Sequence, residues 1–363
     1  MIPCNDLLRS YNLFKNEFEE AAINTLRSGR YILGENCSSF ESEFSKLIGS
    51  KYCISCDNGT NAIFLGLKAL GIGPDDEVIV QTNTYIATVM GITRNGAKPI
   101  FVEPNDFYNM SDAIDDKIGP KTKAILVTHL FGQATKLNHI IELCEKHKIY
   151  LLEDCAQAHF ATYNGKYVGT IGKIGFFSFY PTKNVGALGD AGCLVTDDEE
   201  VAKRLFELRN YGSTKRYHFD IDGGINSRMD ELQAAFLRVR LKHVKDLTEE
   251  KKKIATAYLN GIKNNLVKLP KIDDGCTSVW HLFVLEVEDR DAFMHFLREK
   301  GVDSDIHYPI PPHLSKCYSY LGYRKGDFPI AEYLSEHIVD IPIFNGMTDS
   351  EISTVIEAIN EYE

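Results

Sequence analysis

Short apolar runs alternate with longer helical patterns between about residues 50 and 200 of the chain. The segments between several of the runs repeat apolar residues every three to four positions, as one face of a helix does. Apolar strands separated by such helices predict βαβ units, and therefore a mainly parallel sheet covered on both faces. The expected strands are KYCISC (51–56), DEVIVQ (76–81), AKPIFVE (97–103), KAILVTH (123–129), IYLLED (149–154), FFSFY (176–180) and CLVTD (193–197). The expected helices between them are GTNAIFLGLKALG (59–71), TYIATVMGITRNG (84–96) and KLNHIIELCEKHK (136–148).

The pattern changes after residue 228, where a helical pattern runs over residues 229–262. A helix of this length is expected to break or bend, and to lead into a second domain. Beyond it we expect a strand at VWHLFVLEV (279–287), a helix at DAFMHFLREKG (291–301), a strand and loop at DSDIHYPI (303–310), and a closing helix at DSEISTVIEAINEY (349–362). The predicted fold is α/β, with a large, mainly parallel domain over residues 1–244 and a smaller C-terminal α+β domain over residues 245–363. An N-terminal helix within residues 12–29 could pack on either domain.

Composition and charge narrow the function classes. The chain has 363 residues, of which 44% are hydrophobic and 25% charged, as in ordinary globular proteins. Its formal net charge of −11 argues against a broad surface for nucleic acid or anionic membranes. An anionic small substrate remains compatible if basic residues gather locally.

The cysteines and the N-terminus indicate a cytoplasmic protein. Nine cysteines are scattered along the chain, an odd number that is typical of reduced thiols and not of a disulfide framework. Cys53 and Cys56 form a C-x-x-C, but no second Cys or His pair stands at zinc spacing, so we interpret both as strand residues and expect no metal. Neither a signal peptide nor a membrane-spanning apolar run is apparent.

The first candidate for chemistry is Lys183, in FFSFYPTKNVGALGDAG (176–192). It follows a strand, and strand-end loops are where α/β folds present reactive groups. Lysine forms Schiff bases with carbonyl compounds. Gly186, Gly189 and Gly192 after it permit close backbone approach. A lysine in this position is more often simply solvated, so the interpretation needs further residues.

EDCAQAH (153–159) supplies an acid at a neighbouring strand end. Asp154 ends the strand IYLLED, so its carboxylate is expected at the carboxyl edge of the sheet. Pyridoxal phosphate (PLP) needs such an acid beside its ring nitrogen, because the protonated ring accepts the electron pair of a carbanion. Gln157, three residues on, could reach the phenolic oxygen of the ring. The alternative role for Asp154 is a helix N-cap after the strand.

DNGTNA (57–62) predicts an anion site, because a strand ends there, a turn follows, and a helix begins at Thr60. Backbone N–H groups at a helix start, with a hydroxyl beside them, can hold a phosphate. Tyr85, which opens the next helix, could lay its ring on a flat cofactor, although an aromatic residue there is more often part of the core. A lysine, an acid, a phosphate cradle and an aromatic ring at strand ends of one domain are far more specific together than singly.

These segments together resemble the DegT/DnrJ/StrS family of sugar aminotransferases, within the aspartate aminotransferase superfamily of fold type I PLP enzymes. The resemblance extends over almost the whole length. Its landmarks occur in order as RYILGENCSSFESEF, DNGTNA, NTYIAT, HLFGQA, EDCAQAH, FFSFYPTKN, GALGDAG, NYGS, INSRMDELQAA, VWHLFV, IHYPIPPH and GDFPIAE. Phe160 departs from the family pattern, which usually has glycine after the His of EDCAQAH, and FVEP (101–104) replaces a more usual FVD.

The resemblance implies a role for each motif residue. Lys183 would carry the cofactor as a Schiff base, Asp154 would pair with its ring nitrogen, Gln157 would face its phenolic oxygen, and Tyr85 would stack on the ring. Residues implied to hold the phosphate are Gly59, Thr60, Ser178 and, from the neighbouring subunit of a homodimer with shared active sites, Asn226. For Asn226 and Ser227 the alternative is a cap for the following helix.

The resemblance also implies a nucleotide-linked keto sugar as amino acceptor and L-glutamate as donor. HYPIPPH (307–313) is similar to relatives that aminate C-3 of a dTDP-linked 3-keto-6-deoxyhexose, giving a dTDP-3-amino-3,6-dideoxyhexose for surface polysaccharide, glycan or secondary-metabolite biosynthesis. The candidate substrate contacts are Tyr180, Tyr217, Arg228, His307 and His313.

Two alternatives remain open at this point, and a third is disfavoured. One is C-4 amination of a dTDP- or UDP-linked 4-keto sugar. Another is a non-catalytic regulator on the same fold, for which loss of Lys183 or Asp154 would be the expected mark. The third is a sugar dehydratase of this family, which would have His at position 183. The lysine at this position argues against it.

Overall fold

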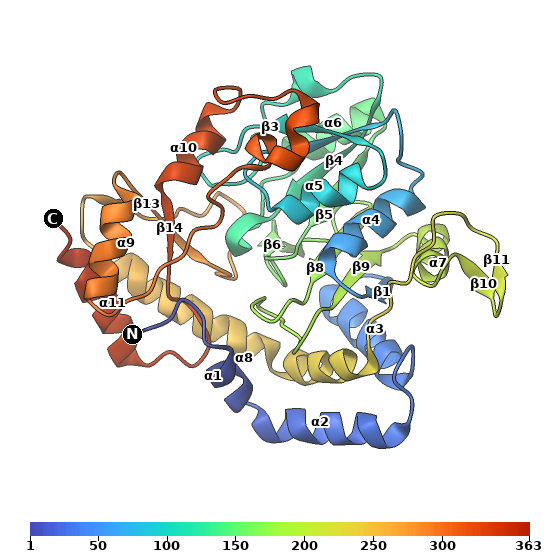
Figure 1. Ribbon diagram of the computed structural model, residues 1–363, viewed down its shortest axis with the longest axis horizontal. Helices are drawn as coiled ribbons and strands as arrows, with labels where there is room; N and C mark the ends of the chain where they lie inside the picture. Colours follow the sequence, from blue (N-terminus) through green and yellow to red (C-terminus); the bar gives the residue numbers. More distant parts are fainter.

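A seven-stranded sheet lies at the centre of the computed structural model, which describes residues 1–363 (Figure 1). Only β9 runs antiparallel to its neighbours, so the expected mainly parallel α/β fold is confirmed. Across the sheet the strands follow the order β1 (Tyr52–Cys56), β9 (Gly192–Thr196), β8 (Ile174–Ser178), β5 (Tyr150–Asp154), β4 (Thr122–Thr128), β2 (Glu77–Gln81) and β3 (Lys98–Val102).

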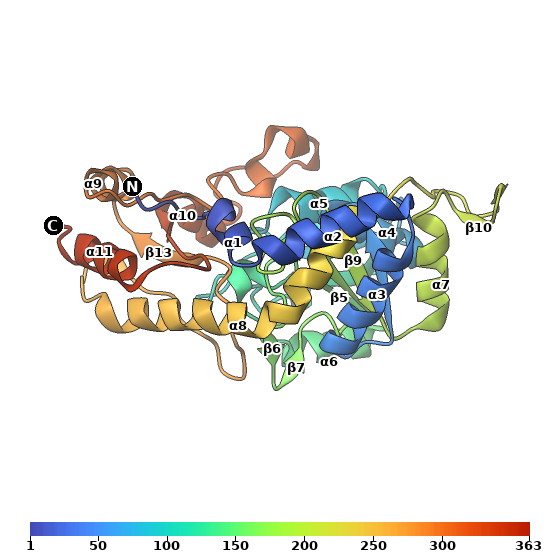
Figure 2. The ribbon, with the colours of Figure 1, turned by 90° about the horizontal axis from the view of Figure 1, so that it is seen from below.

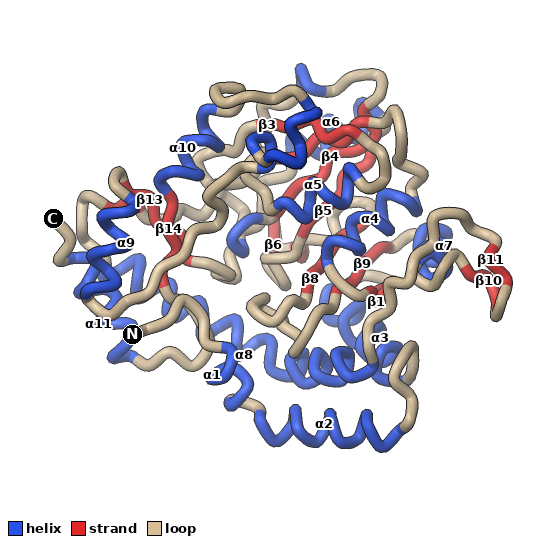
Figure 3. The backbone as a smooth tube through the Cα atoms, in the orientation of Figure 1, coloured by secondary structure: helices blue, strands red, loops and turns tan.

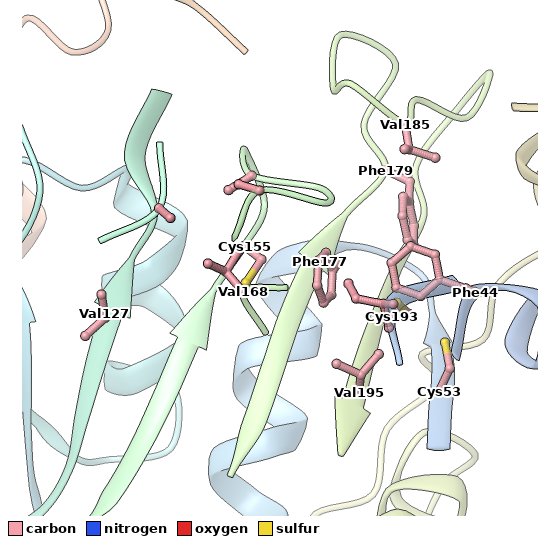
Figure 4. Packing of buried hydrophobic residues seen from close by; sticks show 14 of the residues in the cluster. Phe44, Cys53, Val127, Cys155, Val168, Phe177, Phe179, Val185, Cys193 and Val195 are labelled. Carbon is pink, nitrogen blue, oxygen red and sulfur yellow. The ribbon is translucent and has the colours of Figure 1, made fainter. Parts of the chain in front are cut away.

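Helices cover both faces of this sheet, as continuous apolar strands require. The helices on one face are α4 (Gly59–Ala69), α5 (Ile86–Thr93) and α7 (Glu199–Leu208). On the other face lie α3 (Glu35–Ile48), α6 (Asn138–His147) and the first half of α8 (Glu231–Gly261). Figure 4 shows Phe44 of α3 packed against Phe177, which lies in β8, and against Phe179, which follows the end of this strand. Cys53 and Cys56 are both buried in β1, but they belong to the cores of opposite faces, so the two thiols cannot share a ligand.

The long helix α8 connects the two parts of the chain. It is one continuous helix of 31 residues that changes direction along its length (Figure 2). Its C-terminal half packs on a three-stranded antiparallel sheet in a separate apolar core. The elements of this smaller unit are β12 (Val267–Lys268), β13 (Phe283–Val287), α9 (Arg290–Glu299), β14 (Ile338–Ile341) and α11 (Asp349–Asn360). The predicted division after residue 244 falls within α8 and stays a prediction.

The segment between α9 and β14 returns to the large sheet. The prediction of a strand within residues 303–310 is wrong, because that stretch forms only an isolated bridge between Asp305 and Asp340. After it come η3 (Pro312–Leu314), η4 (Lys316–Leu321) and α10 (Pro329–His337). Glu103 of FVEP accepts the backbone N–H groups of Ile330 and Ala331 at 2.9 and 3.0 Å, which caps α10 and joins it to the end of β3.

The remaining elements lie at the periphery. Of the two N-terminal helices, α1 (Leu7–Asn12) and α2 (Lys15–Ser28), the second packs on α8, where Phe18 meets Phe236 and Val239. The hairpin of β10 (Ser213–Lys215) and β11 (His218–Phe219) projects from the body (Figure 3). Three short pieces remain: the η1 (Asp115–Lys117) and η2 (Leu130–Gly132) turns, and the ladder of β6 (Thr162–Tyr163) with β7 (Lys166–Tyr167). No helix has the length and apolar character needed to cross a membrane.

Phe160, the departure from the family pattern, occupies a left-handed backbone position with φ of 65°. Glycine, which the family pattern has at this position, adopts this conformation without strain. The Phe160 ring packs 5.7 Å from Phe44 and 5.6 Å from Tyr167, so apolar contacts offset the conformational cost.

Glu231 generates a prediction about stability. Its carboxylate accepts the backbone N–H groups of Gly34, Asn36 and Cys37 at 2.7, 2.8 and 2.9 Å, and so ties α8 to the start of α3. Glu231→Gln places an amide donor against N–H donors, and we expect it to lower the free energy of unfolding by about 2 kcal/mol in urea titrations. Glu249→Gln, at an exposed position of the same helix, is the control. Equal stability of the two variants would contradict this role.

Candidate active site

Lys183 and Asp154 line the same cavity, which has a volume of about 730 Å³. It lies at the carboxyl edge of the large sheet, where the parallel strands end, and the smaller unit closes it with residues near β13 and β14. Of the residues that the sequence suggested, the cavity brings together Gly59, Thr60, Tyr85, Asp154, Gln157, Ser178, Tyr180, Lys183 and His307.

Lys183 stands in the loop after β8. Its backbone N–H donates to the carbonyl of Tyr180 at 2.8 Å, which closes a turn around Pro181 and Thr182 and directs the side chain into the cavity. Burial lowers the pKa of the Lys183 ammonium to about 8, against an opposing effect of the Asp154 carboxylate. A lysine with this pKa provides a sizeable fraction of neutral amine near neutral pH, the form that attacks carbonyl carbon.

Asp154 is the last residue of β5 and is only 4% exposed. Its carboxylate accepts the Thr88 hydroxyl at 2.7 Å and the Ala156 backbone N–H at 3.0 Å. Burial raises the pKa of Asp154, while these two hydrogen bonds and the charge of Lys183 act in the opposite direction. No helix begins at Asp154, so the alternative role as a helix N-cap is wrong. A buried carboxylate of this kind can hold a proton on a basic ring nitrogen.

The start of α4, where the sequence predicts an anion cradle, lies beside the end of β8. Asn58 is the N-cap and accepts the N–H of Asn61 at 2.8 Å. Gly59 and Thr60 occupy the first two helical positions, whose N–H groups have no acceptor within the helix. A Cβ atom on Gly59 would lie 2.7 Å from Cβ of Ser178, so only glycine lets the two segments approach this closely.

Gln157 and Tyr85 border the space above the cradle, and both also meet Tyr308. Gln157 accepts the Phe131 N–H at 2.7 Å and donates to the Tyr308 hydroxyl at 3.0 Å. The half-exposed Tyr85 ring lies 4.8 Å from the Tyr308 ring at 31°. Their contacts with a cofactor ring stay predictions.

His307 and Tyr180 line the outer part of the cavity. His307 is hydrogen-bonded through Nδ1 to the buried Asp340, which raises the pKa of the imidazole against the effect of burial. The Tyr180 side chain is 51% exposed.

Four candidates lie outside this cavity. Asn226 and Arg228 border a separate depression, and Arg228 donates to Asn210 at 3.3 Å. Tyr217 stands on the projecting hairpin at 76% exposure. His313 is buried against Phe328 and bonded to Glu332 at 3.0 Å, so it supports the fold of its segment and is not directed at the cavity.

Asp230 occupies the N-cap position of α8, without a capping hydrogen bond from its side chain, so the alternative assignment of Asn226 and Ser227 as its cap is wrong. Ser227 is instead bonded through its hydroxyl to Asp57, just before the cradle.

The sequence argument missed three residues around Lys183. His281 lies with Nε2 at 3.4 Å from Nζ of Lys183, and Lys251 of α8 is buried behind it. Asn184 contacts both of them through its side-chain oxygen. The landmarks FFSFYPTKN and VWHLFV contain Asn184 and His281, but neither motif assigned a role to these residues, and Lys251 lies in no landmark.

The donor set fits PLP. Open N–H groups at a helix start suit its phosphate, a buried carboxylate suits its ring nitrogen, and a lysine of depressed pKa suits its aldehyde. These three groups line one cavity large enough for a cofactor and part of a substrate.

Comparison with known proteins agrees with this geometry. A relative from Aneurinibacillus thermoaerophilus, a dTDP-3-amino-3,6-dideoxy-alpha-D-galactopyranose transaminase, is 45% identical over 100% of this chain and 99% of its own length. Streptomyces venezuelae DesV, solved in complex with a ketimine intermediate, superposes with a TM-score of 0.97 at 38% identity, covering 99% of this chain and 98% of that chain. Bacillus subtilis NtdA, solved with bound cofactor PMP, has a TM-score of 0.88 at 29% identity, covering 96% and 81% respectively.

The model of the DegT/DnrJ/EryC1/StrS aminotransferase family matches residues 12–360. The resemblance seen in the sequence motifs is thereby confirmed, and the chain belongs to the DegT/DnrJ/EryC1/StrS aminotransferase family.

Proposed function

We propose that this protein is a PLP-dependent aminotransferase that moves an amino group from L-glutamate to C-3 of a dTDP-linked 3-keto-6-deoxyhexose. The observation that carries the proposal is the placement of Lys183 and Asp154 in one cavity beside the open start of α4. The amino position and the nucleotide follow from the similarity to a dTDP-3-amino-3,6-dideoxy sugar transaminase over the whole chain. The product would be a dTDP-3-amino-3,6-dideoxyhexose.

Each residue of the cavity has a distinct task in this proposal. When bound, PLP supplies an aldehyde carbon that takes up the amino group and a ring that accepts an electron pair. Lys183 holds the cofactor through its amine and, once released, moves the proton at the α-carbon of glutamate. Asp154 keeps the ring nitrogen protonated, since its carboxylate is buried and directed into the cavity. Gly59, Thr60 and Ser178 bind the phosphate.

Three of the four candidates outside the cavity enter the proposal, and only through a homodimer. Asn226 and Arg228 border a different depression, and Tyr217 stands on a hairpin that projects from its own subunit. We propose that they act in the site of a neighbouring subunit, on the phosphate of the cofactor and on the nucleotide. Tyr180 and His307 would contact the substrate from within the same subunit.

The assignment of Lys183 is tested by covalent capture. Borohydride reduction of the PLP-loaded protein should attach the cofactor to the peptide that contains Lys183, as read by mass spectrometry, because only an imine is reduced in this way. Lys183→Ala should lose the adduct while its circular dichroism is unchanged. An adduct of equal yield in Lys183→Ala would show that another lysine carries the cofactor.

The role of Asp154 is tested by Asp154→Asn. The amide is isosteric but cannot hold the ring nitrogen in its charged form, so turnover should fall by at least about 100-fold, or ~2.7 kcal/mol in the activation barrier. Turnover is measured with glutamate and the keto sugar, and PLP retention by absorbance. Near-normal turnover with bound cofactor would remove the acid role from Asp154.

The substrate is tested with a panel of dTDP- and UDP-linked 3-keto and 4-keto sugars, with glutamate as donor and mass spectrometry of the products. We expect amination of the dTDP-linked 3-keto-6-deoxyhexose, because the HYPIPPH loop is similar to that of C-3 enzymes. Turnover of a 4-keto sugar alone would overturn the C-3 assignment. No turnover of any sugar by PLP-loaded protein would favour the regulator.

A further inference from the structure

Lys251 is a buried cation that the proposed reaction does not use. Its side chain lies on the inner face of α8 and the residue is only 4% exposed. The polar contacts of its ammonium are two neutral oxygens, Oδ1 of Asn184 at 3.3 Å and the carbonyl of His281 at 3.4 Å. Burial, with a contribution from the charge of Lys183, lowers the pKa of Lys251 to about 7. A buried lysine without a carboxylate partner destabilises a fold, so its presence calls for a functional reason.

Asn184, next to the catalytic lysine, has its side-chain orientation determined by its neighbours. Its Nδ2 donates to the carbonyl of Val279 at 2.7 Å. Its Oδ1 faces Nζ of Lys251 and Nδ1 of His281, each at 3.3 Å. A backbone carbonyl can only accept, so the reverse orientation of the amide would place Oδ1 against the carbonyl of Val279 and lose this hydrogen bond.

The tautomer of His281 follows from this orientation. Because Oδ1 of Asn184 is an acceptor, Nδ1 of His281 must carry the hydrogen. Its Nε2 then has a free lone pair, which lies 3.4 Å from Nζ of Lys183. The imidazole is 5% exposed, and burial together with the charges of Lys183 and Lys251 holds the pKa of His281 well below its usual value. The ring therefore stays neutral and keeps its lone pair.

We propose that Lys251 and Asn184 are positioning residues that hold His281 as the Nδ1–H tautomer, so that its Nε2 accepts a hydrogen bond from the Lys183 amine whenever this amine is detached from the cofactor. The inference rests on the proposed function, because it assigns the detached amine to Lys183. In an amino transfer this amine would be released in the glutamate half-reaction, move a proton in both halves, and rejoin the cofactor only at the end of the sugar half-reaction. A fixed acceptor keeps Nζ beside the reacting carbon throughout.

The other titratable groups around the pair support a neutral His281. Asp154 is the acid that faces Lys183. His159 has no hydrogen-bond partner on either ring nitrogen, and burial lowers its pKa to about 3, so it is uncharged. His307 bears on His281 as a positive charge and further disfavours its protonation. The largest effects on the pKa of His281 are burial and neighbouring cationic groups, and all of them lower it, which favours the neutral ring with Nε2 as an acceptor.

The test reads the tautomer directly in the full-length protein, with and without PLP. Two-bond ¹⁵N–¹H spectra of ¹⁵N-histidine-labelled protein, assigned by the signal lost in His281→Gln, distinguish the two tautomers and the imidazolium. We expect the Nδ1–H tautomer between about pH 6 and pH 8. The Nε2–H tautomer, or an imidazolium in this range, would overturn the proposal. This readout needs no sugar substrate, so it stands apart from any failure of the C-3 assignment.

Lys251→Met tests the contribution of the buried charge. Removing the charge should raise the pKa of His281 in the same spectra, because Lys251 is one of the two lysines whose charge lowers it. Lys251→Arg should restore the wild-type titration, and Lys253→Met, at an exposed position of the same helix, should leave it unchanged. An unchanged titration in folded Lys251→Met would contradict the role of Lys251.

Asn184→Asp keeps the proposal testable if Lys251→Met does not fold. A carboxylate beside Nδ1 favours the imidazolium, whose Nε2–H can no longer accept from Lys183. The glutamate half-reaction, followed by the change in cofactor absorbance, should be slowed about tenfold near pH 6 and approach the wild-type rate as the pH rises and the ring loses its proton. A deficit that is the same at every pH would indicate a merely structural role and overturn the proposal.

Discussion

The site depends on keeping one carboxylate charged inside the protein. Asp154 is almost fully buried, and burial alone favours its neutral form. The Thr88 hydroxyl, the Ala156 N–H and the charge of Lys183 replace the water that the carboxylate has lost. The lysine in turn has its pKa depressed by the same burial. The charge of each group therefore affects the pKa of the other. The proposed chemistry needs a charged carboxylate at Asp154 and a neutral amine at Lys183.

The parallel sheet makes this arrangement possible, because its strands end at one edge. Asp154 ends β5, Ser178 ends β8, and the start of α4 follows β1 at the same edge. The strand beneath is held by the neighbouring Glu153, whose carboxylate accepts the N–H groups of Gly169, Ile171 and Gly172. Glu153 also bonds to His129, and together with Cys155 these residues offer ligand types that metals prefer. Since the oxygens of Glu153 are already occupied by N–H donors, we interpret this cluster as an anchor for β5.

The smaller unit completes the cavity, and one continuous helix, α8, connects it to the large unit. Helix α8 contributes to the core of the large sheet and to that of the three-stranded sheet, so both cores share one rigid element. Glu103 fastens α10 to the end of β3, which brings the loop with His307 and Tyr308 over the cradle. Helix α8 also places Lys251 behind Lys183, where Asn184 connects Lys251 to His281. The contacts that hold the two units together are thus also the contacts that place residues around the cavity.

The periodicity and the motifs of the sequence alone determined the α/β class and the strands of the large sheet, and they singled out the candidate lysine, acid and phosphate cradle. They did so because alternation of strands and helices, and the residues at strand ends, are local properties of the chain. Only the tertiary structure decided what depends on distant segments. It showed that His313 is buried against Phe328, that residues 303–310 form no strand, and that Arg228 and Tyr217 lie outside their own cavity. It also brought Lys251 and His281 to Lys183 from about 70 and 100 residues away, a proximity that comes from packing and leaves no local pattern in the sequence.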